Sequence, residues 1–269
     1  MHIDELLLQV KQQITNTEHK AIIKIDSSWA QGRTIFGGIS TALVYQAIWQ
    51  TVSHDRVLRS LNTNFVGPIS PNVGLHIEVE ILREGKNVTQ VMAKAVQNDR
   101  VCIVSQASFG VAKKSKIRVE NLELHNMEMP KKAKFLPQIP KLVPKFLQHL
   151  DISIAAGKIP FSGAKDSYMH GWMRFKQAPE KITDAHLIAL IDAWPPAVLQ
   201  MLKWPAPASS MSWNVEFIHP HISLKPTDWF AYQVKTRQAA DGYGHTEANI
   251  WDSAGELVAI SRQTVAIFD

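Results

Sequence analysis

The stretch LIALIDAWPPAVLQML, residues 187–202, places one carboxylate, Asp192, inside an otherwise apolar helical segment and follows it with Pro195 and Pro196. A carboxylate buried without partners is costly and tends to take up a proton instead. Prolines remove backbone donors and end, kink or restart a helix. We therefore expect Asp192 to be paired, exposed or in use, or else to cap a helix that restarts at the prolines.

The composition is that of a globular protein. The chain has 269 residues, of which 45% are hydrophobic and 20% charged, enough for one large domain or two ordinary ones. The net charge of +5 is mild and spread out, which argues against a nucleic-acid partner and suits small anionic ligands. Cys102 is the single cysteine, so an intramolecular disulfide and a cysteine-built metal site are excluded, and a cytoplasmic setting is favoured. The apolar run in residues 1–14 is too short for a signal peptide or membrane span, and predicts an amphipathic helix.

On either side of a central segment, the chain has two halves with a similar order of predicted elements, and residues 187–202 belong to the second half. Each half has a strand candidate, one helical segment and four further strand candidates. In the first half these are residues 21–30, the helix from Gly37, and strands near 58–67, 74–84, 87–98 and 101–111; in the second they are 168–176, the helix 184–203, and strands near 211–218, 228–239, 244–252 and 257–268.

Short motifs support the duplication. Asn64-Phe65-Val66-Gly67-Pro68 parallels residues 216–220, EFIHP, and residues 101–106, VCIVSQ, parallel residues 258–263, VAISRQ, at offsets of 152 and 157 positions. Two matches in the same order indicate a repeated unit of strand, helix and antiparallel strands. This alignment makes Gln106 the counterpart of Gln263, and we interpret Gln106 as a structural relic because the first helix carries no acid.

The duplication predicts an α+β architecture in which two antiparallel sheets each wrap a long helix and join edge to edge, which removes a pair of exposed edges. The predicted units are an N-terminal domain at 1–112 and a C-terminal domain at 166–269. Between them, residues 113–165 are rich in lysine and proline and predict a linker or cover segment with one short helix.

This pattern resembles the double hot-dog fold, and four segments sharpen the resemblance. Residues 36–47, FGGISTALVYQA, are similar to the start of the first helix in acyl-CoA thioesterase II-type proteins. Residues 190–199, LIDAWPPAVL, resemble the Asp-Ala-x-Pro-Pro-Ala segment of the thioesterase-like superfamily. Residues 210–220 and 257–268 resemble that family's following strand and last strand. The resemblance covers nearly the whole chain outside 113–165.

The resemblance implies an acyl-CoA thioesterase that uses water directly, releases free CoA and a carboxylic acid, and needs neither a metal nor an organic cofactor. Carried over by position, the family's water-holding set falls on Asp192, Ser210 and Gln263, with Ser209 and Ser212 close enough to be alternatives to Ser210. Chains of this kind often pair further, so the resemblance also implies a homodimer.

Chemistry gives an independent reason for such a set. Hydrolysis of a thioester needs a base, which Asp192 could supply, and groups that hold the water, which suits Ser210 and Gln263. Backbone N–H groups at Gly37 and Gly38, at a helix start, are suited to a developing oxyanion, although two glycines there are equally consistent with a tight turn. Two tryptophans, Trp194 and Trp213, lie near the motifs. They are expected either to pack in the core or to line an acyl pocket.

The sequence is less consistent with a metal site and with several other enzyme classes. His219-Pro220-His221 lies in a predicted turn with no third ligand in spacing, so a solvated loop is favoured over a metal site. The chain has no G-x-S-x-G elbow and no Walker or G-x-G-x-x-G loop, which argues against serine hydrolases and nucleotide enzymes. The rival functions are a non-catalytic acyl-CoA binding protein and a hot-dog enoyl-CoA hydratase. The hydratase would need an Asp and a His a few residues apart in a loop before the helix, and no such pair lies near Gly38 or Asp192.

Overall fold

The computed structural model describes residues 1–15, 19–131, 143–221 and 224–268. The helices are α1 (Ile3–Gln13), α2 (Gly37–Gln50) and α3 (Asp184–Ile191), with short 3-10 turns η1 (Ser27–Trp29), η2 (Lys145–His149) and η3 (Ala197–Met201). The strands are β1 (Lys20–Lys24), β2 (Ala30–Gln31), β3 (Thr34–Ile35), β4 (Val57–Phe65), β5 (Gly74–Glu84), β6 (Val88–Gln97), β7 (Arg100–Gly110), β8 (Leu150–Ala156), β9 (Tyr168–Phe175), β10 (Ala208–Phe217), β11 (Phe230–Ala240), β12 (Tyr243–Trp251) and β13 (Leu257–Ile267).

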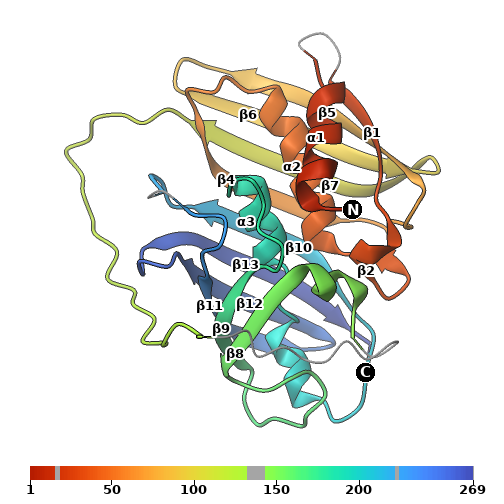
Figure 1. Ribbon diagram of the computed structural model, residues 1–269, viewed down its shortest axis with the longest axis vertical. Coiled ribbons are helices and arrows are strands. Elements are labelled where there is room, and N and C mark those ends of the chain that lie inside the picture. Colours follow the sequence, from red (N-terminus) through yellow and green to blue (C-terminus); the bar gives the residue numbers. More distant parts are fainter. Residues whose placement is uncertain (16–18, 132–142, 222–223, 269) are drawn as a thin grey trace.

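One antiparallel sheet runs through both halves of the chain. Its 11 strands follow the order β1-β5-β6-β7-β4-β10-β13-β12-β11-β9-β8, and the halves meet where β4 pairs with β10. Figure 1 shows the N-terminal half in red to yellow beside the C-terminal half in green to blue. The predicted edge-to-edge junction is therefore present, and it makes a single continuous sheet.

The β4–β10 junction lies on a local two-fold axis. Asn62 and Asn214, which are 152 positions apart, are paired there, and Asn214 Nδ2 donates to Asn62 Oδ1 over 2.8 Å. Bulges lie at the same place in each half, between Leu58 and Ser60 on β4 and between Ser210 and Ser212 on β10. A bulge is a specific local feature of a strand, so its repetition supports the duplicated unit.

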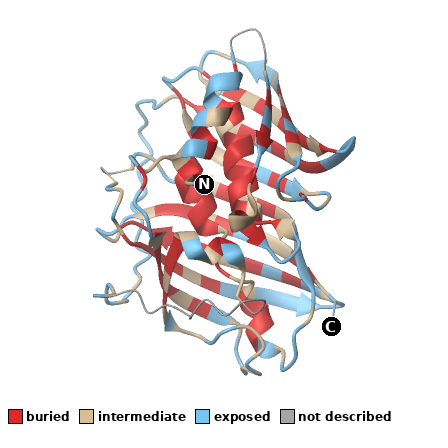
Figure 2. Cartoon of the chain, turned by 45° about the vertical axis from the view of Figure 1, so that its right-hand side comes forward, coloured by how far each residue is buried: buried red, intermediate tan, exposed pale blue. Residues whose placement is uncertain are grey.

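Both main helices are buried against the sheet and against each other. Every residue of α3 after Asp184 is buried, as are the residues of α2 from Gly38 to Tyr45. Figure 2 shows these helices in red on the inner face of the sheet. The amphipathic helix predicted for residues 1–14 is α1, which buries Ile3, Leu6 and Val10 and packs on α2.

The predicted helix over residues 184–203 is wrong in its second half. The helix α3 ends at Ile191, Asp192 is its C-cap residue, and the chain resumes as η3 after the prolines. A continuing helix would need donors at Pro195 and Pro196, because their N–H groups would bond the carbonyls of Ile191 and Asp192, and proline has none. The prolines thus place Asp192 at a helix end.

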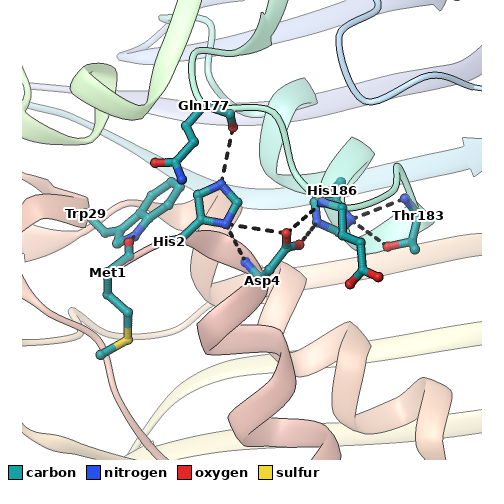
Figure 3. Close-up of polar contacts among 8 residues, drawn as sticks. Met1, His2, Asp4, Trp29, Gln177, Thr183 and His186 are labelled. Atoms are coloured by element: carbon teal, nitrogen blue, oxygen red, sulfur yellow. Dashed lines mark hydrogen bonds and ion pairs between the residues drawn. The ribbon is translucent and has the colours of Figure 1, made fainter.

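The start of α3 is fixed by a polar chain from the N-terminal helix (Figure 3). The Thr183 backbone N–H donates to His186 Nδ1 over 3.2 Å, and the Thr183 hydroxyl lies 2.8 Å from the same nitrogen. Nε2 of His186 is then left to donate to Asp4 Oδ1, 2.8 Å away. Burial lowers the pKa of His186, although Asp4 acts in the opposite sense. This network ties α1 to the first turn of α3.

The segment predicted as a linker, residues 113–165, has two parts. Its end forms β8, the outer edge strand beside β9, so this portion belongs to the sheet. Its beginning crosses the outer face of the sheet, where Trp251 Nε1 donates to the Glu123 carbonyl over 2.9 Å. Met127 packs there on an apolar cluster of Trp172, Trp229, Ala231 and Trp251. This first part covers tryptophans that would otherwise face solvent.

A strand glycine gives a test of how tightly β9 packs against β8 and Trp194. A Cβ at Gly171 on β9 would lie 2.2 Å from the Ser153 carbonyl oxygen and 2.5 Å from Trp194 Cη2. We expect Gly171→Ala to destabilise the protein by about 1–3 kcal/mol or more, because neither neighbour can withdraw freely. Urea unfolding measures this change. The matched control is Gly74→Ala on β5, where the nearest atom is 3.5 Å away. Equal stabilities of the two variants would contradict this account of the packing.

Candidate active site

Three polar side chains from three elements meet at the end of α3. Gln263 Nε2, on β13, donates to Asp192 Oδ1 over 2.8 Å. Ser210 Oγ, on β10, donates to Gln263 Oε1 over 3.4 Å. Ser210 and Gln263 are partly exposed, whereas the carboxyl group of Asp192 is the buried end of the cluster. The structure thus brings together three residues that lie far apart in the sequence.

Strand register selects one serine among the three candidates. Ser210 pairs with Val265, on the face of β13 that also carries Gln263. Ser212 pairs with Thr264, whose side chain points to the opposite face of the sheet. Ser209 is exposed and its hydroxyl contacts only the neighbouring carbonyl of Ser210, among the hydrogen bonds of the described residues. The bulge at Met211 lets Ser210 keep the inner face.

The first turn of α2 meets Asp192 from the other half. A Cβ at Gly37 would lie 2.9 Å from Asp192 Oδ2, so glycine is required for this close approach. A Cβ at Gly38 would lie 3.0 Å from the Ala189 carbonyl oxygen of α3. The N-cap residue of α2, Phe36, provides no side-chain cap, and the Gly38 backbone N–H instead hydrogen-bonds the Asp192 carboxyl group. The N–H groups of this turn and the helix dipole make it suited to negative charge.

Burial raises the pKa of Asp192 to about 7, while hydrogen bonds from the Gln263 side chain and the Gly38 backbone act to lower it. The position at the C-terminal end of α3 also disfavours a negative charge. Both protonation states are therefore populated near neutral pH. A carboxyl group with such a pKa is suited to taking up and giving back a proton.

The two tryptophans near the cluster are core residues. Trp194 stacks on Tyr232 with ring centroids 4.9 Å apart, and its Nε1 donates to Met173 Sδ over 3.1 Å. Trp213 pairs with Gln263 along the sheet and donates from Nε1 to Ser261 Oγ over 2.9 Å. Both side chains are at most 5% exposed, so they contribute packing around the cluster.

The other half of the duplication lacks this polar set. Relative to the paired Asn62 and Asn214, the strand register makes Ala107 the counterpart of Gln263 and Leu58 the counterpart of Ser210. On α2, Tyr45 stands where Asp192 stands on α3, counted from the helix starts. The polar cluster is consequently formed once in the described residues.

The predicted equivalence of Gln106 and Gln263 is wrong by one position. Gln106 pairs with Asn62, whereas Asn214 pairs with Arg262, so Arg262 is the counterpart of Gln106. The Gln106 side chain is exposed and donates to Gln90 over 3.4 Å, on the face away from α2. A shift of one residue moves a strand side chain to the opposite face, so the two glutamines differ in environment.

The solvated loop predicted for His219-Pro220-His221 is also wrong. Both histidine side chains are only 12% exposed, and they face Asp184 at the start of α3. Burial lowers the pKa of His219 to about 4, with His221 and Arg59 adding to the effect. Asp184 lies 35 residues before His219, so the sequence spacing offered no signal for this grouping.

A groove of about 360 Å³ lies over the β4–β10 junction, lined in part by Asn62, Asn214 and Arg262. These side chains alternate with inward-facing neighbours and belong to the outer face of the sheet. Gln263 also lines this groove, whereas Asp192 and Ser210 do not. Within the described ranges, the structure contains no helix that is both long and apolar enough to cross a membrane.

Comparison with known proteins identifies both halves of the chain. A family model described as the acyl-CoA thioesterase N-terminal domain matches residues 25–110. A second model, described as the acyl-CoA thioesterase C-terminal domain, matches residues 123–267.

A curated relative and two solved structures resemble the chain along most of its length. Acyl-CoA thioesterase 2 of Haemophilus influenzae is 24% identical over 254 residues, covering 86% of each chain. A hot-dog protein of unknown function from Alicyclobacillus acidocaldarius has a TM-score of 0.80 at 19% identity, covering 98% of both chains. The tesB protein of Mycobacterium avium subsp. paratuberculosis has a TM-score of 0.78 at 17% identity, covering 99% of this chain and 100% of the other. The structural likeness establishes the hot-dog fold.

The raised pKa of Asp192 predicts how stability changes with pH. Because the carboxyl group has a pKa of about 7 in the folded state and about 3.8 when unfolded, its protonated form stabilises the fold. This contribution is complete below pH 4 and is lost as pH rises through 7. We expect the free energy of unfolding of wild type to fall by up to about 4 kcal/mol relative to that of Asp192→Asn between pH 4 and pH 8. Urea unfolding at both pH values measures it, and a constant difference would contradict the raised pKa.

Proposed function

Because the chain belongs to the acyl-CoA thioesterase family, we propose that it hydrolyses acyl-CoA at the Asp192 cluster, releasing free CoA and a carboxylic acid. It is a thioester hydrolase of the hot-dog fold. The observation that carries the assignment of the site is the hydrogen bond of 2.8 Å between Gln263 and Asp192 beside the glycine turn of α2. This arrangement joins a base, a water-holding amide and a set of backbone donors.

In the proposed reaction, Asp192 takes a proton from a water molecule as the water oxygen attacks the thioester carbonyl carbon. The carbon–sulfur bond then breaks, and the thiolate of CoA receives the proton back from Asp192. Gln263 and Ser210 hold the water, since an amide and a hydroxyl both donate and accept hydrogen bonds. No covalent intermediate with the protein is required.

The developing oxyanion needs donors that do not move during the reaction. The first turn of α2 supplies them in this proposal, through the backbone N–H groups of Gly37 and Gly38. Support comes from the approach of Gly37 to Asp192 Oδ2 and from the hydrogen bond of the Gly38 backbone N–H to the Asp192 carboxyl group, which places this turn beside the proposed base. The N-terminal half would then contribute the oxyanion donors while the C-terminal half contributes the base.

Trp194 and Trp213 are proposed to line the acyl pocket. They pack next to the cluster from the segment after α3 and from β10, and large aromatic side chains are common in pockets for apolar groups. The substrate panel described below measures the acyl-chain length that the protein accepts.

Three finer features remain proposals. We infer that the hot-dog units are residues 1–112 and 166–269, each with its part of the sheet wrapped around its own helix, and that residues 113–165 connect them, cover the outer face and add the edge strand β8. We also infer that the protein acts in the cytoplasm and pairs as a homodimer. Light scattering of the purified chain in solution tests the last inference, and a monomeric mass would reject it.

The role of Asp192 is tested by Asp192→Asn. We expect kcat to fall by about 10²–10⁴-fold with the fold intact, because the amide cannot take the proton from water. The measurement is thiol release from short, medium and long acyl-CoA substrates, followed with a thiol reagent. Unchanged turnover would remove Asp192 from the mechanism. Tight acyl-CoA binding by wild type without thiol release would instead favour a non-catalytic binding protein.

The assignment of Ser210 has a control on the same strand. Ser210→Ala should lower kcat by roughly tenfold, because Gln263 loses the hydrogen bond that orients it. Ser212→Ala removes a hydroxyl from the opposite face of β10 and should leave kcat unchanged. If Ser212→Ala has the larger effect, the register-based assignment is wrong.

The pH dependence of kcat provides an independent test. Asp192 acts as a base only when ionised, so kcat should rise with pH and level off above an apparent pKa near 7. The residual activity of Asp192→Asn should lack this step. A wild-type profile that is flat between pH 5 and pH 8 would be inconsistent with Asp192 as the base.

A further inference from the structure

A second polar cluster lies at the opposite end of the two packed helices. Asp184 is the first residue of α3, and His219 and His221 follow the end of β10. Asp192 lies eight residues after Asp184, roughly 12 Å along a helix, so this cluster is separate from the proposed hydrolytic site. Nothing in the thioesterase mechanism uses it.

We propose that Asp184, His219 and His221 form a binding site for one divalent transition-metal ion. His219 Nε2 lies 3.9 Å from Asp184 Oδ2, and His221 Nδ1 lies 3.8 Å from Asp184 Oδ1. The three ligand atoms lie within 4.8 Å of one another. In a tetrahedral zinc site, neighbouring ligand atoms are about 3.3 Å apart, so small side-chain rotations would close the set around an ion.

The hydrogen-bond pattern supports an ion at this position. The Nε2 atoms of His219 and His221 are both inaccessible to solvent and have no hydrogen-bond partner among the described residues. Buried imidazole nitrogens in proteins are normally paired, so this pattern calls for an explanation. The two rings are stacked with centroids 4.1 Å apart, which keeps them on the same side of Asp184. For His219 the unpaired Nε2 is also the nitrogen that faces Asp184, so a cation shared with that carboxylate would give it a partner.

The donor set also indicates the kind of ion. Two imidazoles and one carboxylate favour Zn²⁺, Co²⁺ or Ni²⁺ over Mg²⁺ and Ca²⁺, which prefer oxygen ligands alone. Tyr45 Oη, on α2, donates to Asp184 Oδ2 over 3.2 Å and would orient the carboxylate from the neighbouring helix. Three protein ligands leave a fourth position for water.

The local two-fold axis shows that this cluster is not a requirement of the fold. At the other end of the helices, Gly37 stands in the place of Asp184, and Asp192 in the place of Tyr45. In the loop after β4, Gly67 stands where His219 stands after β10, 152 positions later. The fold can therefore form this kind of helix junction without a histidine or an acid at these places. The two histidines are a feature of the C-terminal loop alone.

The test uses the full chain without a histidine tag, stripped of metal with a chelator and dialysed. We expect one equivalent of Zn²⁺ to bind, measured by calorimetry and by metal analysis, and to raise the melting temperature. Co²⁺ in place of Zn²⁺ should give visible absorption bands of a four-coordinate site. His219→Ala and His221→Ala should each weaken Zn²⁺ binding by at least tenfold and abolish those bands.

Two controls keep the outcome clear. His245→Ala removes an exposed histidine on β12 and should bind Zn²⁺ like wild type. Asp192→Asn should also bind Zn²⁺ normally, so failure of the proposed hydrolysis and failure of the metal site are distinguishable. If an alanine variant does not fold by circular dichroism, the glutamine variant at the same position replaces it. Binding of less than one-fifth of an equivalent, or equal affinity in folded variants and wild type, would overturn the proposal.

Discussion

The hydrogen bond between Gln263 and Asp192 holds a carboxyl group at the point where the end of α3 meets the beginning of α2. The surrounding packing depends on this contact being satisfied, because an unpaired carboxylate in an apolar helix junction would be strongly unfavourable. Gly37 is needed for the approach of the two helices at this point, and β13 is needed to deliver the amide. A raised pKa follows from the same burial, so the pH dependence of stability and the proposed role of Asp192 as a base have one physical origin.

The duplicated architecture explains why the site has contributions from both halves. Two helices that pack around a local two-fold axis create two equivalent junctions, one at each end of the pair. At one junction the chain carries Asp192, Gly37 and Gln263, and at the other it carries Tyr45, Asp184 and Ala107 in the corresponding places. The symmetry is thus retained in the backbone and lost in the chemistry of the side chains.

The proline pair and the outer face show how local sequence shapes this arrangement. Pro195 and Pro196 end the hydrogen-bonding pattern of α3, so that Asp192 becomes a helix end instead of a mid-helix acid. On the far side of the sheet, the beginning of the 113–165 segment covers the tryptophans of the C-terminal half through Glu123 and Met127. The helices therefore pack on the inner face of the sheet, and the covering segment packs on part of its outer face.

The sequence by itself determined the strands of both halves, the starts of α2 and α3, and the duplicated order, because these depend on local periodicity and on short motifs. Resemblance to a family supplied Asp192, Ser210 and Gln263 as candidates, but the choice of Ser210 over Ser209 and Ser212 rested on a bulge and on strand register. Side chains alternate between faces along a strand, so an alignment error of one residue, as for Gln106, reverses the environment and cannot be detected from composition. The grouping of Asp184 with His219 and His221 was decided only by the tertiary structure, since it depends on a helix start and a distant loop being brought together by packing.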